Sequence, residues 1–102
     1  MGTDFPGIAD DSVDFLFSFG CFVHLDANLI EQYLKNMRRI LKGRGNAVIQ
    51  YSDKNKIAAQ NNPSFSDNTP DRTRKIVLES GFRIVEEDLT TLPHSNVIRF
   101  TA

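Results

Sequence analysis

The sequence contains little cysteine, little net charge and no long uninterrupted apolar run. Only one of its 102 residues is a cysteine, Cys21, which excludes an internal disulfide and a zinc site built from four cysteines. The formal net charge of −1 provides no general attraction to nucleic acid or to an anionic membrane surface. We therefore expect neither nucleic acid nor a membrane among the partners of this chain.

The longest apolar stretch, residues 13–25, is too short to span a bilayer and is interrupted by Ser18, Gly20 and His24. The first residues include Asp4 and no basic segment, unlike a secretory signal peptide. What is present is the composition of an ordinary globular protein, 40% hydrophobic and 25% charged. The sequence therefore predicts a single cytoplasmic domain over residues 1–102.

The first half of the chain predicts a strand followed by a helix. The run over residues 13–19 is rich in phenylalanine and apolar at successive positions, as in a strand covered by helices on both faces. Apolar residues then recur at helical spacing over residues 27–41. We expect the carboxylate of Asp26 to cap this helix and Gly43 or Gly45 to end it.

The second half predicts a loop, one helix and three short strands. The expected elements are a strand at 46–51, a polar loop at 53–69, a helix at 70–80, and strands at 82–88 and 96–101. Thr69 followed by Pro70 is a strong helix start, and Gly81 a strong helix stop. A loop as long as 53–69 without structure of its own is usually functional or mobile.

The order of these elements predicts an α/β fold. The first strand–helix–strand unit favours two parallel strands joined by a right-handed crossover. The last two strands are close enough in sequence to form an antiparallel pair. We therefore expect an open sheet of mostly parallel strands with an antiparallel terminal strand, and a ferredoxin-like α+β layer is the alternative.

Several short motifs occur together and in a fixed order. They are FPGI at 5–8, DFLFSF at 14–19 followed by Val23-His24, RILKG at 39–43, YSD at 51–53 and SGF at 80–82. Together they resemble the C-terminal half of a class I S-adenosylmethionine-dependent methyltransferase, of the methyltransferase domain family. The resemblance covers essentially the whole chain and implies a partial Rossmann-like methyltransferase sheet. The glycine-rich cofactor turn of such enzymes and the acidic residue that holds the ribose hydroxyls are both lacking.

The resemblance also implies candidate site residues. Ser18, Phe19 and Gly20 end the first strand, where they would contact S-adenosylmethionine if the missing half were supplied. His24 is the candidate catalytic base, because histidine titrates near neutrality and methyl transfer to oxygen or nitrogen often requires removal of a proton. A histidine bonded to the backbone beside the helix start is the alternative. Members of the family commonly carry an acidic residue and a serine where this chain has Gly20-Cys21.

Other polar residues predict no site. Asp10, Asp11 and Asp14 with His24 match no spacing of metal ligands, so we expect no metal. His94 follows Pro93 in a polar stretch and should lie in an exposed turn.

These observations separate ancestry from activity. The first hypothesis is a truncated methyltransferase-like domain that is inactive alone, barely binds S-adenosylmethionine alone and would act on a small-molecule acceptor when complete. The alternatives are a small self-associating α/β binding module, and a module that uses the same strand-end crevice for another small molecule. Whether the chain alone is an enzyme stays open. The uncovered edge of the strand at 13–19 predicts a homodimer or homo-oligomer.

Overall fold

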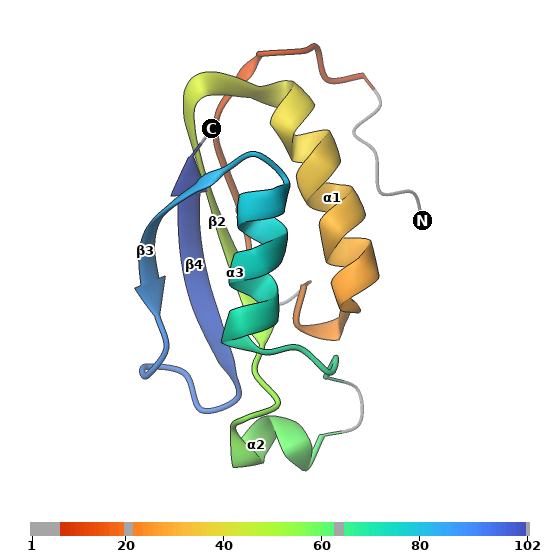
Figure 1. Ribbon diagram of the computed structural model, residues 1–102, viewed down its shortest axis with the longest axis vertical. Helices are drawn as coiled ribbons and strands as arrows, with labels where there is room; N and C mark the ends of the chain where they lie inside the picture. The colour runs from red at the N-terminus through yellow and green to blue at the C-terminus, as the bar shows by residue number, and fades with distance from the viewer. Residues whose placement is uncertain (1–6, 20–21, 63–64, 102) are drawn as a thin grey trace.

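In a computed structural model, which describes residues 7–19, 22–62 and 65–101, the chain forms a four-stranded sheet with helices packed against it (Figure 1). The elements in chain order are β1 (Val13–Ser18), a short 3-10 helix η1 (Phe22–His24), α1 (Ala27–Ile40), β2 (Leu41–Ser52), α2 (Ile57–Gln60), α3 (Pro70–Glu79), β3 (Arg83–Asp88) and β4 (Ser95–Thr101). Within the described residues no helix combines the length and the hydropathy needed to cross a membrane.

The strands are arranged in the order β1-β2-β4-β3. β1 is parallel to β2, whereas β4 lies between β2 and β3 and is antiparallel to both. Three strands therefore point one way and the last strand runs against them. This confirms the predicted α/β sheet with an antiparallel terminal strand. It also places β1 at an edge of the sheet.

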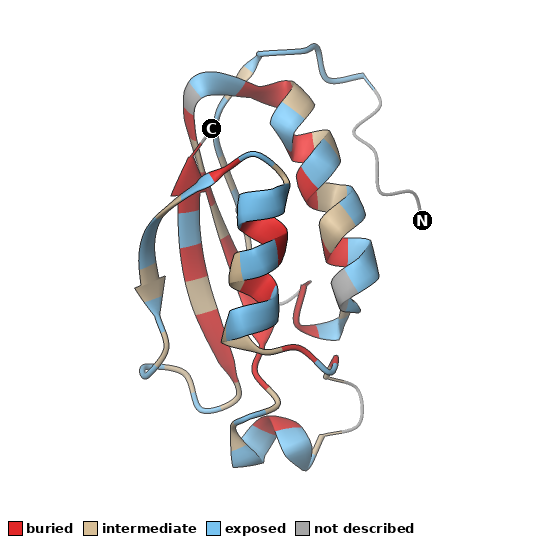
Figure 2. Cartoon of the chain, in the orientation of Figure 1, coloured by how far each residue is buried: buried red, intermediate tan, exposed pale blue. Residues whose placement is uncertain are grey.

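The core lies between the sheet and α1 and α3, which both cover the same face of the sheet (Figure 1). Ile30, Leu34 and Met37 of α1 are at most 1% exposed, because their helical spacing points all three toward the strands. Figure 2 shows the buried residues concentrated on the inner sides of these helices and along β2 and β4. One face of the sheet therefore supplies most of the buried apolar area.

The other face of the sheet is bare within the described residues. Phe15, Phe17 and Phe19 are 56%, 67% and 57% exposed. The prediction that this strand is covered on both faces is therefore wrong. The near-continuous apolar run predicts a two-sided strand, but Phe15, Phe17 and Phe19, at alternate positions of the run, are exposed.

The ends of α1 also differ from the prediction. Asp26 occupies the N-cap position, but its side chain makes no capping hydrogen bond. The helix ends at Ile40, and Leu41 passes directly into β2 in an extended conformation (φ −73°, ψ 135°). Gly43 and Gly45 therefore do not end the helix, because the chain turns into the strand without a left-handed residue.

Gly45 has a different structural role in β2. A Cβ atom built at Gly45 would lie 3.0 Å from the carbonyl oxygen of Val13 in β1, closer than ordinary contacts allow. The glycine thus lets the two parallel strands approach each other at the irregular start of their ladder, where the register shifts between Val13 and Phe15.

The start and stop of α3 agree with the sequence prediction. The Oγ1 atom of Thr69 accepts a hydrogen bond from the backbone N–H of Arg72 at 3.3 Å, and Pro70 occupies the first turn. Gly81 has a φ of +90°, a conformation that glycine adopts without steric cost. These signals place the helix correctly to within about one residue at each end.

The sequence predicts a loop without structure of its own over 53–69, and this prediction is wrong. The segment contains α2, and it buries Ala59, Ser66 and Asn68. The backbone N–H of Ser66 donates to the carbonyl of Val23 at 2.8 Å, which ties the segment to η1. The polar composition gave no sign of this burial, because Asp53 is buried as well and three of the four buried side chains are polar.

Candidate functional site

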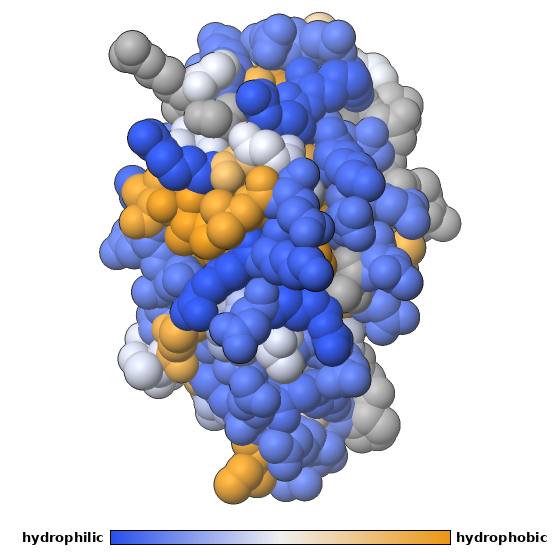
Figure 3. Space-filling view, viewed as in Figure 1, coloured by the Kyte–Doolittle hydropathy of each residue, from blue (hydrophilic) through white to orange (hydrophobic). Residues whose placement is uncertain are grey.

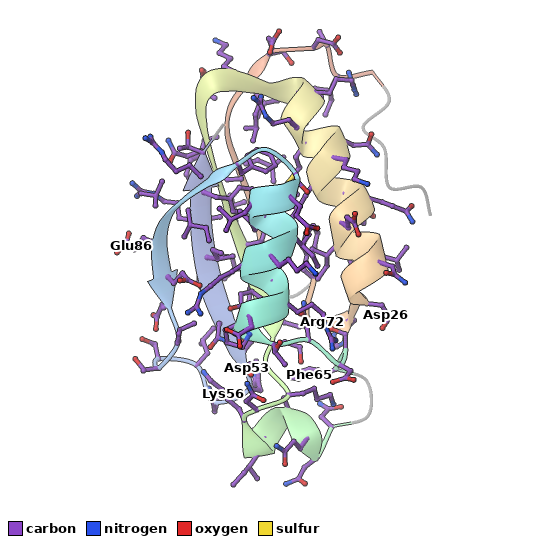
Figure 4. All side chains as sticks on the ribbon, viewed as in Figure 1. Asp26, Asp53, Lys56, Phe65, Arg72 and Glu86 are labelled. Atoms are coloured by element: carbon purple, nitrogen blue, oxygen red, sulfur yellow. The ribbon has the colours of Figure 1, made fainter. Side chains whose placement is uncertain are left out.

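The candidate site lies at the carboxyl ends of β1 and β2, the edge at which open α/β sheets bind ligands. The segments around it are η1, residues 53–69 and the loop that leads into β4. In Figure 4, Asp53, Lys56 and Phe65 lie beyond the end of β2, and Asp26 and Arg72 lie near the first turns of α1 and α3. Glu86 lies apart from them, on β3.

Three aromatic rings from separate segments contact one another edge to face at this edge of the sheet, and we call them the ring stack. The ring centroid of Phe65 lies 5.3 Å from that of His24 and 4.7 Å from that of His94, with interplanar angles of 62° and 71°. These are edge-to-face distances that favour aromatic contact. His24 is exposed, whereas Phe65 and His94 are half-buried. The prediction that His94 lies in an exposed turn is therefore wrong, because Phe65 packs against its ring.

Two residues after His94, Asn96 belongs to a buried polar network. The Nδ2 atom of Asn96 donates to Oδ2 of Asp53 at 2.8 Å and to Oη of Tyr51 at 3.4 Å. Tyr51 and Asn96 are fully buried and Asp53 is 4% exposed. Burial raises the pKa of Tyr51 to about 12; the carboxylates of Glu87 and Asp53 add to the rise, and the hydrogen bond from Asn96 opposes it.

The side chain of Lys56 links the segment 53–69 to the loop that leads into β4. Its Nζ atom donates to the carbonyls of Leu92 and Ser95 at 2.6 and 2.9 Å. The backbone N–H of Asp53 donates to the carbonyl of His94 at 3.1 Å. Asp53 and His94 are therefore held next to each other by contacts within the chain, as expected of a preorganised site.

A second feature is a hollow of about 380 Å³ on the bare face of the sheet. Its lining includes Phe19, Val48, Leu92 and Val97, which are apolar, together with Glu86 and Arg99. Its volume is in the range of small-molecule pockets. Because Phe19 is 57% exposed, the hollow is open to solvent on the β1 side.

The residues predicted from the sequence are divided between these two features. His24 lies in the ring stack and Phe19 lines the hollow. Ser18 is half-buried and pairs with Ile49 in the parallel ladder. Gly20 and Cys21 lie outside the described residues. Nothing in the sequence pointed to Phe65 or to the contact between Asp53 and Asn96.

The predicted aspartates have other partners. Asp10 forms an ion pair with Arg39 at 2.5 Å, and Asp14 forms one with Lys42 at 3.2 Å. Across residues 7–19, 22–62 and 65–101, no three histidine, cysteine, aspartate or glutamate side chains are grouped so that they could hold a metal ion.

Part of this chain matches a known protein family. Residues 2–49 match the model of a family described as a methyltransferase domain. No curated protein matches the sequence.

Solved structures give similar folds. An S-adenosylmethionine-dependent methyltransferase from Mesorhizobium loti superimposes with a TM-score of 0.78 and 12% identity, over 100% of this chain and 67% of that one. One from Archaeoglobus fulgidus gives 0.74 and 16% identity, over 93% and 62%. A magnesium protoporphyrin IX methyltransferase from Synechocystis, solved with bound S-adenosylhomocysteine (SAH), gives 0.67 and 14% identity, over 88% and 45%.

The fold of this chain is therefore part of the class I S-adenosylmethionine-dependent methyltransferase fold, and the resemblance in its motifs is confirmed. The chain spans about half to two thirds of the length of these proteins. At such low identities the superpositions establish the fold alone.

Proposed function

We propose that this chain supplies the acceptor-side part of a methyltransferase domain, and that it neither binds S-adenosylmethionine tightly nor transfers a methyl group by itself. The observation that carries the proposal is the edge position of β1. Phe19 follows the end of this strand, and its side chain is 57% exposed. In this proposal the described residues form one wall of a cofactor pocket at that point.

The residues present do not fit the cofactor. A bound small molecule usually has 70–90% of its surface buried, whereas the wall at Phe19 faces open solvent. The chain also lacks a glycine-rich turn after a strand and an acidic residue placed to hold the ribose hydroxyls. S-adenosylmethionine supplies the transferred methyl group when such a domain is complete.

His24 is the side chain we propose as the base for the methyl acceptor. Its imidazole is exposed at the candidate edge, next to Phe65, so a small acceptor can reach it from solvent. The neighbouring rings of Phe65 and His94 offer the acceptor an aromatic surface. In this proposal Phe65 and His94 position the acceptor, and His24 removes its proton.

Isothermal titration of the chain with S-adenosylmethionine tests the proposal. We expect a dissociation constant of about a millimolar or weaker, because each lost contact of about 1.4 kcal/mol weakens binding tenfold. The buffer without protein and a complete methyltransferase serve as controls for the heat signal. A low-micromolar dissociation constant would overturn the proposal.

A binding module that has kept this part of the fold is the second candidate function. The hollow of about 380 Å³ favours it, because its apolar residues together with Glu86, Asp88 and Arg99 suit a ligand with an apolar body and a polar group. The same titration discriminates partly, since a module of this kind has no need of S-adenosylmethionine. Binding of a small apolar dye that Phe19→Lys abolishes would support the module, and equal dye binding by both chains would count against it.

A further inference from the structure

The imidazole of His94 has one nitrogen atom inside the protein and one that reaches solvent. Its Nδ1 atom is buried and has no hydrogen-bond partner within the described residues. Its Nε2 atom also has no partner in that part of the chain, but Nε2 is not among the buried atoms. Because the residue as a whole is half-buried, a molecule at this edge of the sheet reaches Nε2 and not Nδ1.

Contacts on both sides of His94 hold its ring in this orientation. The Nζ atom of Lys56 donates to the carbonyls of Leu92 and Ser95 at 2.6 and 2.9 Å. The ring of His94 packs against that of Phe65, with the two centroids 4.7 Å apart. The backbone before and after His94 is therefore tied to Lys56, and an aromatic contact restrains the ring itself.

The burial of Nδ1 decides which nitrogen carries the proton of the neutral imidazole. A neutral histidine has one N–H donor and one acceptor nitrogen. A proton on Nδ1 of His94 would be a buried N–H without an acceptor, and such orphaned donors are costly and rare. We therefore expect the proton on Nε2. His94 is then a hydrogen-bond donor and not a base, because a base needs an unprotonated nitrogen that the ligand can reach.

We propose that His94 donates a hydrogen bond from Nε2–H to the methyl acceptor and so selects acceptors that react through a hydroxyl oxygen. The inference rests on the proposed function above, in which His24 removes the proton of the acceptor. His24 and His94 both contact Phe65, with ring centroids 5.3 and 4.7 Å from it, so the two imidazoles flank the same aromatic side chain. The proton of the hydroxyl group passes to His24. The oxygen then carries negative charge and accepts a charge-assisted hydrogen bond from His94.

An amine acceptor fits this arrangement poorly. Near neutral pH an alkylamine is an ammonium ion with N–H donors and no lone pair, so it would face the Nε2–H of His94 donor to donor. A hydroxyl group both donates and accepts, so it can face the two histidines at once. Figure 3 shows mostly hydrophilic surface over the lower part of the molecule, which includes α2, so apolar contact alone does not distinguish ligands there.

Two-bond ¹H–¹⁵N correlation spectra of the ¹⁵N-labelled chain identify the tautomer at about pH 8, where histidine side chains are ordinarily neutral. The sequence contains only two histidines, so His24→Gln assigns the signals of His94. We expect a protonated Nε2 and an unprotonated Nδ1. A protonated Nδ1, or comparable amounts of the two tautomers, overturns the proposal.

Titration with phenol and with benzylamine, observed through the same spectra, tests the selectivity. Phenol stands for a hydroxyl acceptor and benzylamine for an ammonium one. We expect phenol to shift the signals of both histidines in a saturable way, and benzylamine to require at least about tenfold higher concentration for the same shift. No shift at Nε2 of His94 with phenol, or equal shifts with the two probes, overturns the proposal.

Two substitutions of His94 separate its donor from its ring. His94→Phe keeps an aromatic ring next to Phe65 but has no donor, whereas His94→Gln keeps an N–H donor and lacks the ring. At the signals of His24, the preference for phenol over benzylamine should be largely kept in His94→Gln and lost in His94→Phe. A preference that persists in His94→Phe, with circular dichroism showing an intact fold, overturns the proposal, because the ring alone would then suffice.

These spectra contain no S-adenosylmethionine, so their outcome is separate from that of the calorimetric test of the proposed function. Tight binding of the cofactor would overturn the proposed function and leave the tautomer of His94 as found. A mixture of tautomers would overturn the role of His94 and leave the expected weak binding of the cofactor unchanged.

Discussion

The bond between Asn96 and Asp53 should be one of the most stabilising polar contacts in this fold. Asn96 is fully buried and Asp53 is 4% exposed, so neither group can exchange its partner for water. The Nδ2 atom of Asn96 lies 2.8 Å from Oδ2 of Asp53. Replacing Asn96 with alanine removes this donor and leaves a carboxylate oxygen buried without it.

The expected magnitude follows from the burial. A hydrogen bond to a charged group contributes roughly 1.5–3 kcal/mol, and leaving the buried partner unsatisfied puts the cost at the upper end. We expect Asn96→Ala to lower the free energy of unfolding by about 3 kcal/mol. Asp53→Ala should cost a similar amount, since Asp53 also accepts the backbone N–H of Asn55 at 2.9 Å. The double variant should cost about 2 kcal/mol less than the sum of the two.

Urea unfolding followed by circular dichroism measures all three values, at one protein concentration because association shifts apparent stability. Asn28→Ala is the matched control, since Asn28 is exposed near the start of α1 and its loss should change stability by less than about 0.5 kcal/mol. A cost below about 1 kcal/mol for Asn96→Ala, or strict additivity in the double variant, would refute the reasoning.

Two further predictions concern titratable side chains at the same edge. The folded chain raises the pKa of Tyr51 from 10.0 to about 12, so the stabilisation from this shift is complete below pH 10 and disappears between pH 10 and 12. Two pKa units correspond to about 3 kcal/mol, and Tyr51→Phe should flatten the alkaline decline in unfolding free energy by that amount; equal slopes would contradict the assignment. His24→Gln should change the unfolding free energy by less than about 0.5 kcal/mol, because His24 is exposed. A cost above about 1.5 kcal/mol would indicate a structural histidine instead of a base.

The strand order could be predicted only in part from the sequence. The crossover rule gave the parallel pair β1 and β2, and the short separation of the last two strands gave their antiparallel pairing. The position of β4 between β2 and β3 could not be predicted from the local sequence, because it depends on which edge of β2 is available for pairing in the folded sheet. The contact of Asn96 with Asp53 depends on this position, since Tyr51 pairs with Asn96 across β2 and β4.

The errors in the sequence analysis have a shared physical cause. The apolar run at 13–19, which only Asp14 and Ser18 interrupt, predicts burial on both sides, although composition cannot report whether a second layer is present to bury it. Gly43 and Gly45 were interpreted as helix stops, although Gly45 is required by the close approach of Val13. In both cases the local sequence pattern is the same whether the residue serves a contact between distant segments, a turn or a buried core. Only the tertiary structure distinguishes these roles.

The two faces of this sheet therefore have different physical roles. The helix side buries Ile30, Leu34 and Met37 against β2 and β4, and it has enough internal contact to define a single packed layer. The bare side retains three large rings that are each more than half exposed, at a cost in solubility that natural proteins usually avoid by adding charge. β1 carries no lysine and no proline. Apolar surface of this kind is usually covered in a complete α/β sheet, so the exposure of Phe15, Phe17 and Phe19 agrees with a chain that spans only part of the fold of its structural relatives.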